Sequence, residues 1–406
     1  MSPTFAECGD PRPAAAPGRD RPGPDIGGGT DALTPDDLRA RGSLKWTATD
    51  PGDLGAWVAE MDLPLAPAIR RTLHDAIEQG LTGYLPPAAQ QAAERAAAAW
   101  QHRRYGWAVD PADVHLTTSV LRALQVMLDH LTPPGTPVVL PVPAYMPFLD
   151  VPALAGRELR TVPMTHTADG AITFDLDAIA AALVPGAVLV LTNPHNPTGR
   201  VFTAAELRAV ADVVDAAGAL VFADEIHAPV VFDGRRHVPY ATVSDRAAEH
   251  TVTGTSASKG WNIAGLGCAQ LIVSGAAMRE RWATVPFLVQ HGVGPLGALA
   301  TAAAYDEGQA HLDATVGYLQ RGRDLFVRRL AEVVPTVPVA PIEGTYLAWV
   351  DLRSVDRSVA DLQAAARVRG VDGQACGAPG FLRLNLALPH PLVGELADRL
   401  GRAIDA

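Results

Sequence analysis

The hydrophobic positions along this chain follow two different periods. Helical spacing, with an apolar residue every three or four positions, predicts helices at residues 67–80, 88–105, 119–131, 203–217 and 295–334. Short apolar or β-branched runs between them predict strands at 114–116, 137–140, 187–191, 219–223, 251–254 and 268–273. Because strands that are apolar on both faces alternate with helices, we expect an α/β fold in which helices cover both sides of a parallel-type sheet.

The pattern changes after Pro335. Residues 345–351 and 381–388 alternate apolar and polar side chains, as half-buried antiparallel strands do, and helical segments lie between and after them. We therefore predict a smaller α+β domain over residues 301–406, next to a large domain over residues 87–300.

Composition and charge restrict the class of protein. The chain is 48% hydrophobic and 19% charged, which is typical of a globular protein, and its formal net charge of −11 argues against nucleic acid or an anionic membrane as a partner. Residues 1–30 are rich in Pro, Gly, Ala and Asp and are expected to be a disordered leader. There is no apolar run of about twenty residues and no secretory signal pattern. The three cysteines match no metal spacing and suit a reducing compartment, so we expect a cytoplasmic protein that binds no metal.

Candidate chemistry begins with one lysine in the stretch 251–266, Thr-Val-Thr-Gly-Thr-Ser-Ala-Ser-Lys-Gly-Trp-Asn-Ile-Ala-Gly-Leu. Lys259 follows a predicted strand and lies among small hydroxyl residues. Only one other lysine, Lys45, occurs in the chain, although arginine is plentiful, which favours a role that arginine cannot fill. The amine of Lys259 can form a Schiff base with an aldehyde or contact a phosphate, and an ordinary exposed lysine is the alternative.

Three other polar segments follow the C-terminal ends of predicted strands, where ligands bind in open α/β sheets. Residues 116–121 open a helix with small hydroxyl side chains, so they form either an anion site or only a helix cap. Asn196 lies between two Asn-Pro pairs in the turn 193–200, which either places its amide or only stiffens the loop. Asp224 ends a buried strand and either caps a neighbouring loop or keeps a pyridine nitrogen protonated.

A fourth candidate, Arg383, lies inside the alternating strand at 381–388. A guanidinium that is buried without a partner is costly in free energy. Arg383 therefore needs a carboxylate, either in the protein or on a substrate.

These positions together match one cofactor, pyridoxal 5′-phosphate (PLP). PLP offers an aldehyde to Lys259, a phosphate to residues 118–120, a ring nitrogen to Asp224 and a ring oxygen to Asn196. The chain also resembles the fold-type I PLP enzymes of the class I/II aminotransferase superfamily. Two motifs carry that likeness, Asn-Pro-His-Asn-Pro-Thr-Gly-Arg at 193–200 and Ser-x-Ser-Lys at 256–259.

Within the superfamily, the chain from about residue 40 onward resembles the branch of the cystathionine β-lyases and cysteine C–S lyases. The motifs behind this likeness are Trp57-Val-Ala-Glu-Met-Asp62, Gly80-x-x-Gly83-Tyr84, Pro143-x-Tyr145-x-Pro147-Phe148, Asp224-Glu-Ile-His227 and Ser258-Lys-Gly-Trp261-Asn-Ile-Ala-Gly-Leu266. The resemblance implies a three-layer, mostly parallel seven-stranded sheet, with residues 31–86 packed against the small domain. It also implies a homodimer with shared active sites.

The resemblance assigns a role to each candidate residue. Lys259 is the expected Schiff-base lysine, Arg383 should hold the substrate α-carboxylate, and Tyr145 should stack on the pyridine ring. Tyr84 should reach the phosphate of the neighbouring subunit and is a second catalytic candidate. The other expected contacts are Asp224 with the ring nitrogen, Asn196 and His227 with the ring oxygen, Ser119, Val120, Ser256 and Ser258 with the phosphate, and Met61, Tyr145 and Asn196 with the amino-acid substrate.

Two departures from the family pattern change the expected site. Many members carry a Lys or Arg eight residues after the lysine, where it contacts the phosphate, whereas this chain has Gly267. The short segment 370–380 contains Cys376 and lacks the aromatic residue often found there. We therefore expect a different phosphate contact and a different pocket wall beside the substrate.

The resemblance implies a PLP-dependent C–S lyase, which eliminates a thiol from cystathionine or another S-substituted cysteine and yields pyruvate and ammonia. The setting would be amino-acid metabolism or the synthesis of natural products. An aminotransferase, or a diverged enzyme that acts on a bulky S-cysteinyl conjugate, would use the same residues and is the alternative. A ligand-sensing regulator that keeps this fold is disfavoured, because the first 40 residues offer no basic DNA-binding domain.

Overall fold

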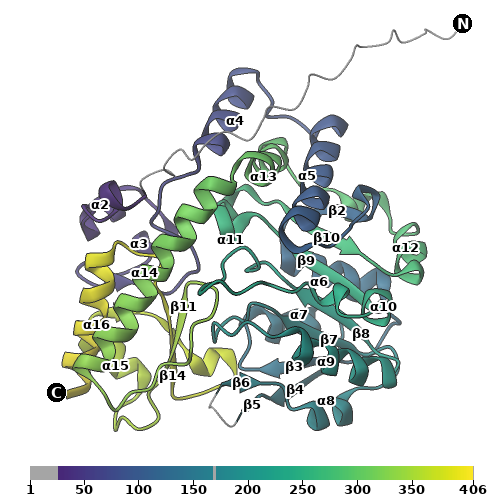
Figure 1. Ribbon diagram of the computed structural model, residues 1–406. Coiled ribbons are helices and arrows are strands. Elements are labelled where there is room, and N and C mark those ends of the chain that lie inside the picture. Colours follow the sequence, from purple (N-terminus) through teal and green to yellow (C-terminus); the bar gives the residue numbers. More distant parts are fainter. Residues whose placement is uncertain (1–25, 168–170, 406) are drawn as a thin grey trace, which may run out of the picture.

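The computed structural model describes residues 26–167 and 171–405. They form a large part built on one wide sheet and a smaller part that holds the helices nearest the C-terminus (Figure 1). Of the expected leader, residues 1–25 lie outside the described residues. The prediction is wrong for its last residues, because Gly27–Thr30 form a short helix, α1, in which Thr30 is buried.

Seven strands form the central sheet in the order β2-β10-β9-β8-β7-β3-β4. Their bounds are Val114–Thr117 for β2, Ala269–Val273 for β10, Thr251–Thr255 for β9, Leu220–Asp224 for β8, Val188–Thr192 for β7, Val138–Val142 for β3 and Leu159–Pro163 for β4. All neighbours are parallel except β10, which runs antiparallel to both β2 and β9. The expected mostly parallel seven-stranded sheet is confirmed. The hydrophobic pattern does not predict the edge strand β4, because only one of its side chains is buried.

Successive residues of the central strands point to opposite faces of this sheet. Val190 and Phe222 belong to one hydrophobic core, whereas Leu189 and Val221 belong to another. The covering helices are α5 (Pro87–Tyr105), α6 (Val120–Val126), α7 (Pro147–Leu154), α8 (Leu176–Ala182), α9 (Ala204–Ala216), α10 (Asp245–Glu249), α12 (Ala276–Trp282) and α13 (Pro295–Glu307). Because each face packs on its own set of helices, the large part has three layers.

Two helical segments differ from the pattern of the sequence. The proline-rich stretch that follows β3 suggests a loop, yet α7 begins at Pro147, because proline is tolerated in the first turn of a helix. Helix α6 begins after Ser119, as expected, but residues Met127–Leu131 continue it as a π-helix. Helix α9 begins as predicted, with a capping box formed by Thr203 and Glu206.

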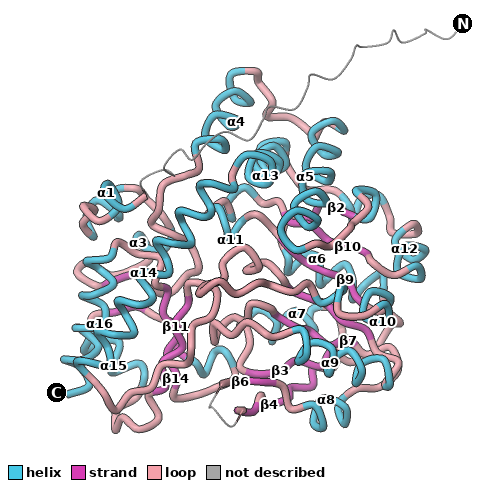
Figure 2. The backbone as a smooth tube through the Cα atoms, in the orientation of Figure 1, coloured by secondary structure: helices cyan, strands magenta, loops and turns pink. Residues whose placement is uncertain are grey.

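The smaller part has its own sheet and shares a core with the N-terminal segment. Strand β14 (Phe381–Asn385) lies between β11 (Leu347–Asp351) and β13 (Val371–Asp372), and both pairs are antiparallel. Figure 2 shows this sheet apart from the larger one. The flanking helices are α14 (Gln309–Val333), α15 (Val359–Ala366) and α16 (His390–Asp405).

No helix in the two described ranges is both long and apolar enough to cross a membrane.

Residues of the N-terminal segment lie in the same core as residues of the smaller part, including Trp46, Leu54, Met61, Leu384 and Leu400. The segment contains α2 (Pro35–Ala40), α3 (Leu44–Thr47), β1 (Leu54–Gly55) and α4 (Pro67–Glu78). Strand β1 pairs in parallel with β12 (Val368–Arg369). Two short strands, β5 (Thr165–His166) and β6 (Ile172–Thr173), form a separate hairpin.

One buried ion pair fixes the N-terminal segment. Lys45 Nζ lies 2.9 Å from Asp62 Oδ2, and the two side chains are 0% and 4% exposed. Lys45 Nζ also donates to the carbonyl oxygens of Glu60 (3.1 Å) and Ala387 (3.2 Å), and Trp46 Nε1 donates to Asp62 Oδ1 at 3.0 Å. Burial lowers the pKa of Lys45 and raises the pKa of Asp62, and their mutual attraction opposes both changes. Each charge therefore depends on the other to stay ionised.

Replacing Lys45 with Met should lower the free energy of unfolding by about 3–5 kcal/mol, because it leaves the Asp62 carboxylate buried without its counter-charge. The measurement is urea unfolding of the cofactor-free protein. Adding Asp62→Asn should recover part of the loss, since it removes the buried charge and keeps an acceptor for Trp46. The control is Arg71→Met in the exposed pair with Glu307, which should cost under about 1 kcal/mol. Equal losses from Lys45→Met and Arg71→Met would contradict this account.

Candidate active site

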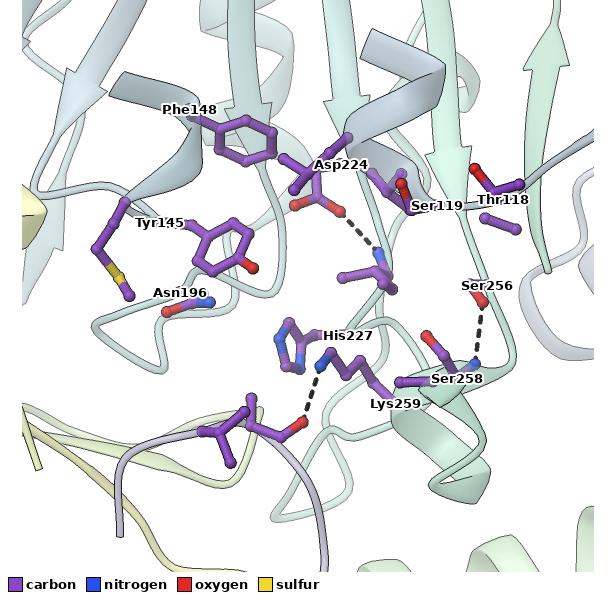
Figure 3. A pocket seen from close by; sticks show the side chains of 18 of the residues that line it. Thr118, Ser119, Tyr145, Phe148, Asn196, Asp224, His227, Ser256, Ser258 and Lys259 are labelled. Atoms are coloured by element: carbon purple, nitrogen blue, oxygen red, sulfur yellow. Dashed lines mark hydrogen bonds between the residues drawn. The ribbon is translucent and has the colours of Figure 1, made fainter. Parts of the chain in front are cut away.

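A cavity of about 330 Å³ lies at the carboxyl ends of β7, β8 and β9. It is lined from the large part by Thr118, Ser119, Val120, Leu121, Tyr145, Met146, Phe148, Asn196, Asp224, Ile226, His227, Ser256, Ser258, Lys259, Ala264, Cys268 and Ala269, and from the rest of the chain by Trp57, Val58, Ala59, Val371 and Arg383. Tyr145 and Asn196 lie at one end, and Ser119 and Ser256 at the other (Figure 3).

Lys259 extends into this cavity beside His227 (Figure 3). It belongs to the single-turn helix α11 (Ser258–Trp261), which ends at Asn262 in the left-handed conformation (φ 57°). Lys259 Nζ donates to the carbonyl oxygen of Ala59 at 2.8 Å. Burial, and after it the nearby charge of Arg383, lowers the pKa of Lys259 to about 8. An amine with this pKa is easily made neutral, as a nucleophile or base must be.

Asp224 ends β8 with its carboxyl group buried at 4% exposure. The backbone N–H of Ile226 donates to Asp224 Oδ1 at 3.1 Å. Burial raises the pKa of Asp224 to about 7, and the charge of Glu225 adds to this effect. A cation placed against this carboxyl group, such as a protonated ring nitrogen, would stabilise its ionised form.

Arg383 crosses from the small sheet into the cavity and is only 2% exposed. It donates to Asn196 Oδ1 (2.9 Å) and to the carbonyl oxygen of Trp57 (2.8 Å), while its Nε has no hydrogen-bond partner. Among the residues that the structure describes, no carboxylate pairs with it. Of the two partners considered for this guanidinium, a carboxylate of the substrate is therefore the one that the geometry favours.

Aromatic and imidazole rings form the remaining wall. The ring of Tyr145 meets that of Phe148 edge-on, with centroids 5.6 Å apart. His227 is 2% exposed and its Nδ1 lacks a hydrogen-bond partner. Burial, together with the charges of Lys259 and Arg383, holds the pKa of His227 well below its usual value. His227 is therefore a neutral ring that can donate or accept one hydrogen bond.

The end of the cavity that contains Ser119 and Ser256 offers only neutral groups. Ser119 caps α6 by accepting a hydrogen bond from the backbone of Arg122. Ser256 Oγ donates to the carbonyl oxygen of Cys268 (2.8 Å) and accepts from the backbone N–H of Ser258 (3.0 Å). The basic side chains of the lining are Lys259, Arg383 and His227. A phosphate at this end would therefore rest on hydroxyl and backbone N–H donors.

Two predicted site residues lie outside this cavity. Tyr84 is 98% exposed and does not line it. Met61 is 6% exposed and packs in the core of the smaller part, where its backbone N–H and C=O bond to Asn262. The structure thus brings all other candidate residues together in one chain and leaves these two apart.

Sequence reasoning missed several lining residues. Trp57, Val58 and Ala59 line the cavity in place of Met61 of the same motif, because the irregular chain there does not show which side chains point inward. Phe148 and Val371 also line it, and neither follows a predicted strand. The motif around Tyr145 is the only indication that could have located Phe148.

The residues present fit PLP. The site combines an amine that can condense with an aldehyde, a buried carboxyl group that gains from a cationic ring nitrogen, and an imidazole nitrogen that lacks a partner. The orphaned guanidinium nitrogen of Arg383 adds a place for a carboxylate.

Comparisons with known proteins agree with this geometry. Residues 58–400 match the family model described as aminotransferase class I and II. Cystathionine beta-lyase of Corynebacterium glutamicum is 34% identical over 376 residues, covering 91% of this chain and 98% of that protein. Cystathionine beta-lyase PatB of Bacillus subtilis is 31% identical over 359 residues, covering 84% and 92%.

A solved structure is similar over the same length. A protein from Corynebacterium diphtheriae, described as a proposed PLP-dependent β-cystathionase, superposes with a TM-score of 0.85 at 34% identity. The alignment covers 92% of this chain and 98% of that one. The likeness therefore extends over both parts of the chain.

The cofactor phosphate should bind more tightly once a cation is placed at position 267. Gly267 adopts φ 58°, and a Cβ there would meet only the carbonyl oxygen of Thr118, at 3.8 Å. Gly267→Lys should bind PLP about tenfold more tightly than Gly267→Ala, because a charge-assisted hydrogen bond to phosphate adds to the neutral donors. Both variants carry the same backbone strain, so their difference isolates the charge. Fluorescence titration of the cofactor-free proteins with PLP measures it, and equal dissociation constants would refute the prediction.

Proposed function

Because the chain belongs to the class I and II aminotransferase family and is a PLP-dependent carbon–sulfur lyase, we propose that it cleaves the Cβ–S bond of cystathionine or another S-substituted cysteine. With one water molecule consumed, the products are a thiol, pyruvate and ammonia. The similarity to cystathionine beta-lyases supports cleavage of this bond. An amino-acid substrate is supported by the buried Arg383, which has no carboxylate partner among the described residues and lies in the same cavity as Lys259.

Bound PLP supplies an electron sink for the charge that develops at Cα. Lys259 Nζ is the base that takes the proton from Cα, since its lowered pKa makes the neutral amine available. Arg383 holds the α-carboxylate and so fixes the Cα–H bond relative to the cofactor ring. Asp224 would hold the ring nitrogen of bound PLP, where its negative charge would keep that nitrogen protonated.

The other lining residues hold the cofactor in place. Tyr145 would pack against the ring of bound PLP, and Asn196 and His227 would bind its ring oxygen. Ser119, the backbone N–H of Val120, Ser256 and Ser258 would hold the phosphate. Met61 supports the substrate side through the backbone of its segment, because its side chain lies in the core.

We also propose that the enzyme is a homodimer in which Tyr84 completes the neighbouring subunit's site. Tyr84 is 98% exposed, and Phe287 and Leu288 are exposed at 70% and 83%, which is unusual for large apolar side chains outside an interface. Leu85, the next residue after Tyr84, packs against a cluster that contains Cys268 of the cavity lining.

The PLP-bound protein should therefore have twice the mass of one chain, which is 42.6 kDa. Light scattering coupled to size-exclusion chromatography measures this mass. Tyr84→Ala should weaken PLP binding although Tyr84 lies outside its own chain's cavity. A monomer with undiminished activity and PLP affinity would rule out the shared site.

The products decide between elimination and transamination, since both begin with the same removal of the Cα proton. Incubation with cystathionine or an S-alkyl cysteine should release thiol and pyruvate in equal amounts. Pyridoxamine phosphate that accumulates without pyruvate would instead indicate an aminotransferase. Lys259→Ala should lose the activity and the visible absorbance of the bound cofactor, and survival of that absorbance would refute the assignment of Lys259.

A further inference from the structure

An arginine that the proposed chemistry does not use stacks on one residue of the cavity lining. The guanidinium carbon of Arg369 lies 4.5 Å from the centre of the Trp57 ring. Arg369 is exposed, whereas Trp57 lines the cavity, and so does Val371, two residues after Arg369. A cation thus lies against one side chain of the cavity wall.

Both members of this stack are fixed by the fold. Arg369 ends β12, and its carbonyl oxygen accepts a hydrogen bond from the backbone N–H of Ala56 at 2.8 Å. Trp57 Nε1 donates to the carbonyl oxygen of Lys45 at 3.1 Å. The carbonyl oxygen of Trp57 accepts from Arg383, so Trp57 connects the two arginines. The position of Arg369 relative to the α-carboxylate site is therefore set by backbone contacts.

The register of the small sheet brings the backbone of Arg369 near Arg383. Val371 pairs with Arg383 across the small sheet. Two residues of extended chain span at most about 7 Å, so the backbone of Arg369 lies within that distance of Val371. Because Trp57 contacts both arginines, a thioether amino acid held at Arg383 by its α-carboxylate has a second guanidinium beside the same cavity wall.

Arg369 differs from a comparable arginine elsewhere. Arg353 also stacks on an aromatic ring, with its guanidinium carbon 4.7 Å from the centre of Phe381, but its Nη2 is bound to Asp351 at 2.7 Å. Among the described residues, no carboxylate forms an ion pair with Arg369. A guanidinium with a free donor edge is the preferred partner of a carboxylate, and stacking on an aromatic ring preorganises it for that contact.

We propose that Arg369, held over Trp57, binds a second carboxylate at the far end of the substrate's S-linked side chain. The preferred substrates are then thioether amino acids that carry a carboxylate on each side of the sulfur. This inference rests on the proposed lyase function and names the substrate class of the same site.

Two matched substrates test it, S-(2-carboxyethyl)cysteine and S-propylcysteine, which differ mainly in the terminal carboxylate. Arg369→Gln should raise the KM of the holoenzyme for S-(2-carboxyethyl)cysteine about tenfold and leave its kcat little changed, because one charge-assisted contact is lost in binding. The KM for S-propylcysteine should not change. The control variant Arg353→Gln, which removes a stacked arginine outside the cavity, should change neither value.

Binding is measured in parallel by titrating the visible spectrum of the bound cofactor with each compound. An Arg369→Gln effect that is equal for both compounds, or is reproduced by Arg353→Gln, would overturn the inference. If the unmodified enzyme cleaves neither compound, the proposed lyase function fails, and the two dissociation constants still report whether Arg369 selects the carboxylate. The absence of such selection would overturn the inference independently.

Discussion

The active site depends on the irregular segment 57–61 being held by side chains from every element around it. Its carbonyl oxygens accept hydrogen bonds from Arg383 at residue 57, from Asn385 at residue 58, from Lys259 and Tyr346 at residue 59, from Asn385 and Lys45 at residue 60, and from Asn262 at residue 61. Buried backbone outside helices and sheets must find such partners, because an unpaired carbonyl is costly. The segment therefore holds Lys259 and Arg383, the two cationic side chains to which we assign the chemistry. These side chains in turn hold the segment.

The charged groups of the site change one another's pKa values. Burial lowers the pKa of Lys259, the charge of Arg383 lowers it further, and Asp224 opposes both effects. An arginine in place of Lys259 would stay protonated and could not act as a base, whereas the lowered pKa leaves a larger fraction of Lys259 neutral and able to take a proton. The scarcity of lysine is consistent with this division, since Lys45 is itself buried in an ion pair and its role is structural.

The candidate residues that follow strands were predictable from the sequence, because the carboxyl ends of parallel strands meet at one edge of a sheet. Asn196, Asp224 and Lys259 all lie there. Arg383 was predictable for another reason, which is that an alternating apolar strand does not tolerate an unpaired charge. The side-chain directions in the 57–61 segment were not predictable, because irregular backbone has no period. Nothing in the motif therefore indicates that the Met61 side chain packs in the core.

The residues assigned to the cofactor and those assigned to the substrate side chain come from different parts of the chain. Groups assigned to the cofactor follow the strands of the central sheet, whose register is fixed by a buried core on each face. The residues that we propose to meet the far end of a substrate, Trp57, Val371 and Arg369, come from the N-terminal segment and the smaller part. Those elements are joined to each other by the parallel pairing of β1 with β12 and by the carbonyl contacts of Trp57. The contacts that hold Lys259 and Arg383 are made by backbone carbonyls. A change of side chain at Trp57 or Val371 can therefore occur without removing those contacts, so enzymes that share this chemistry can differ in the side chain they accept.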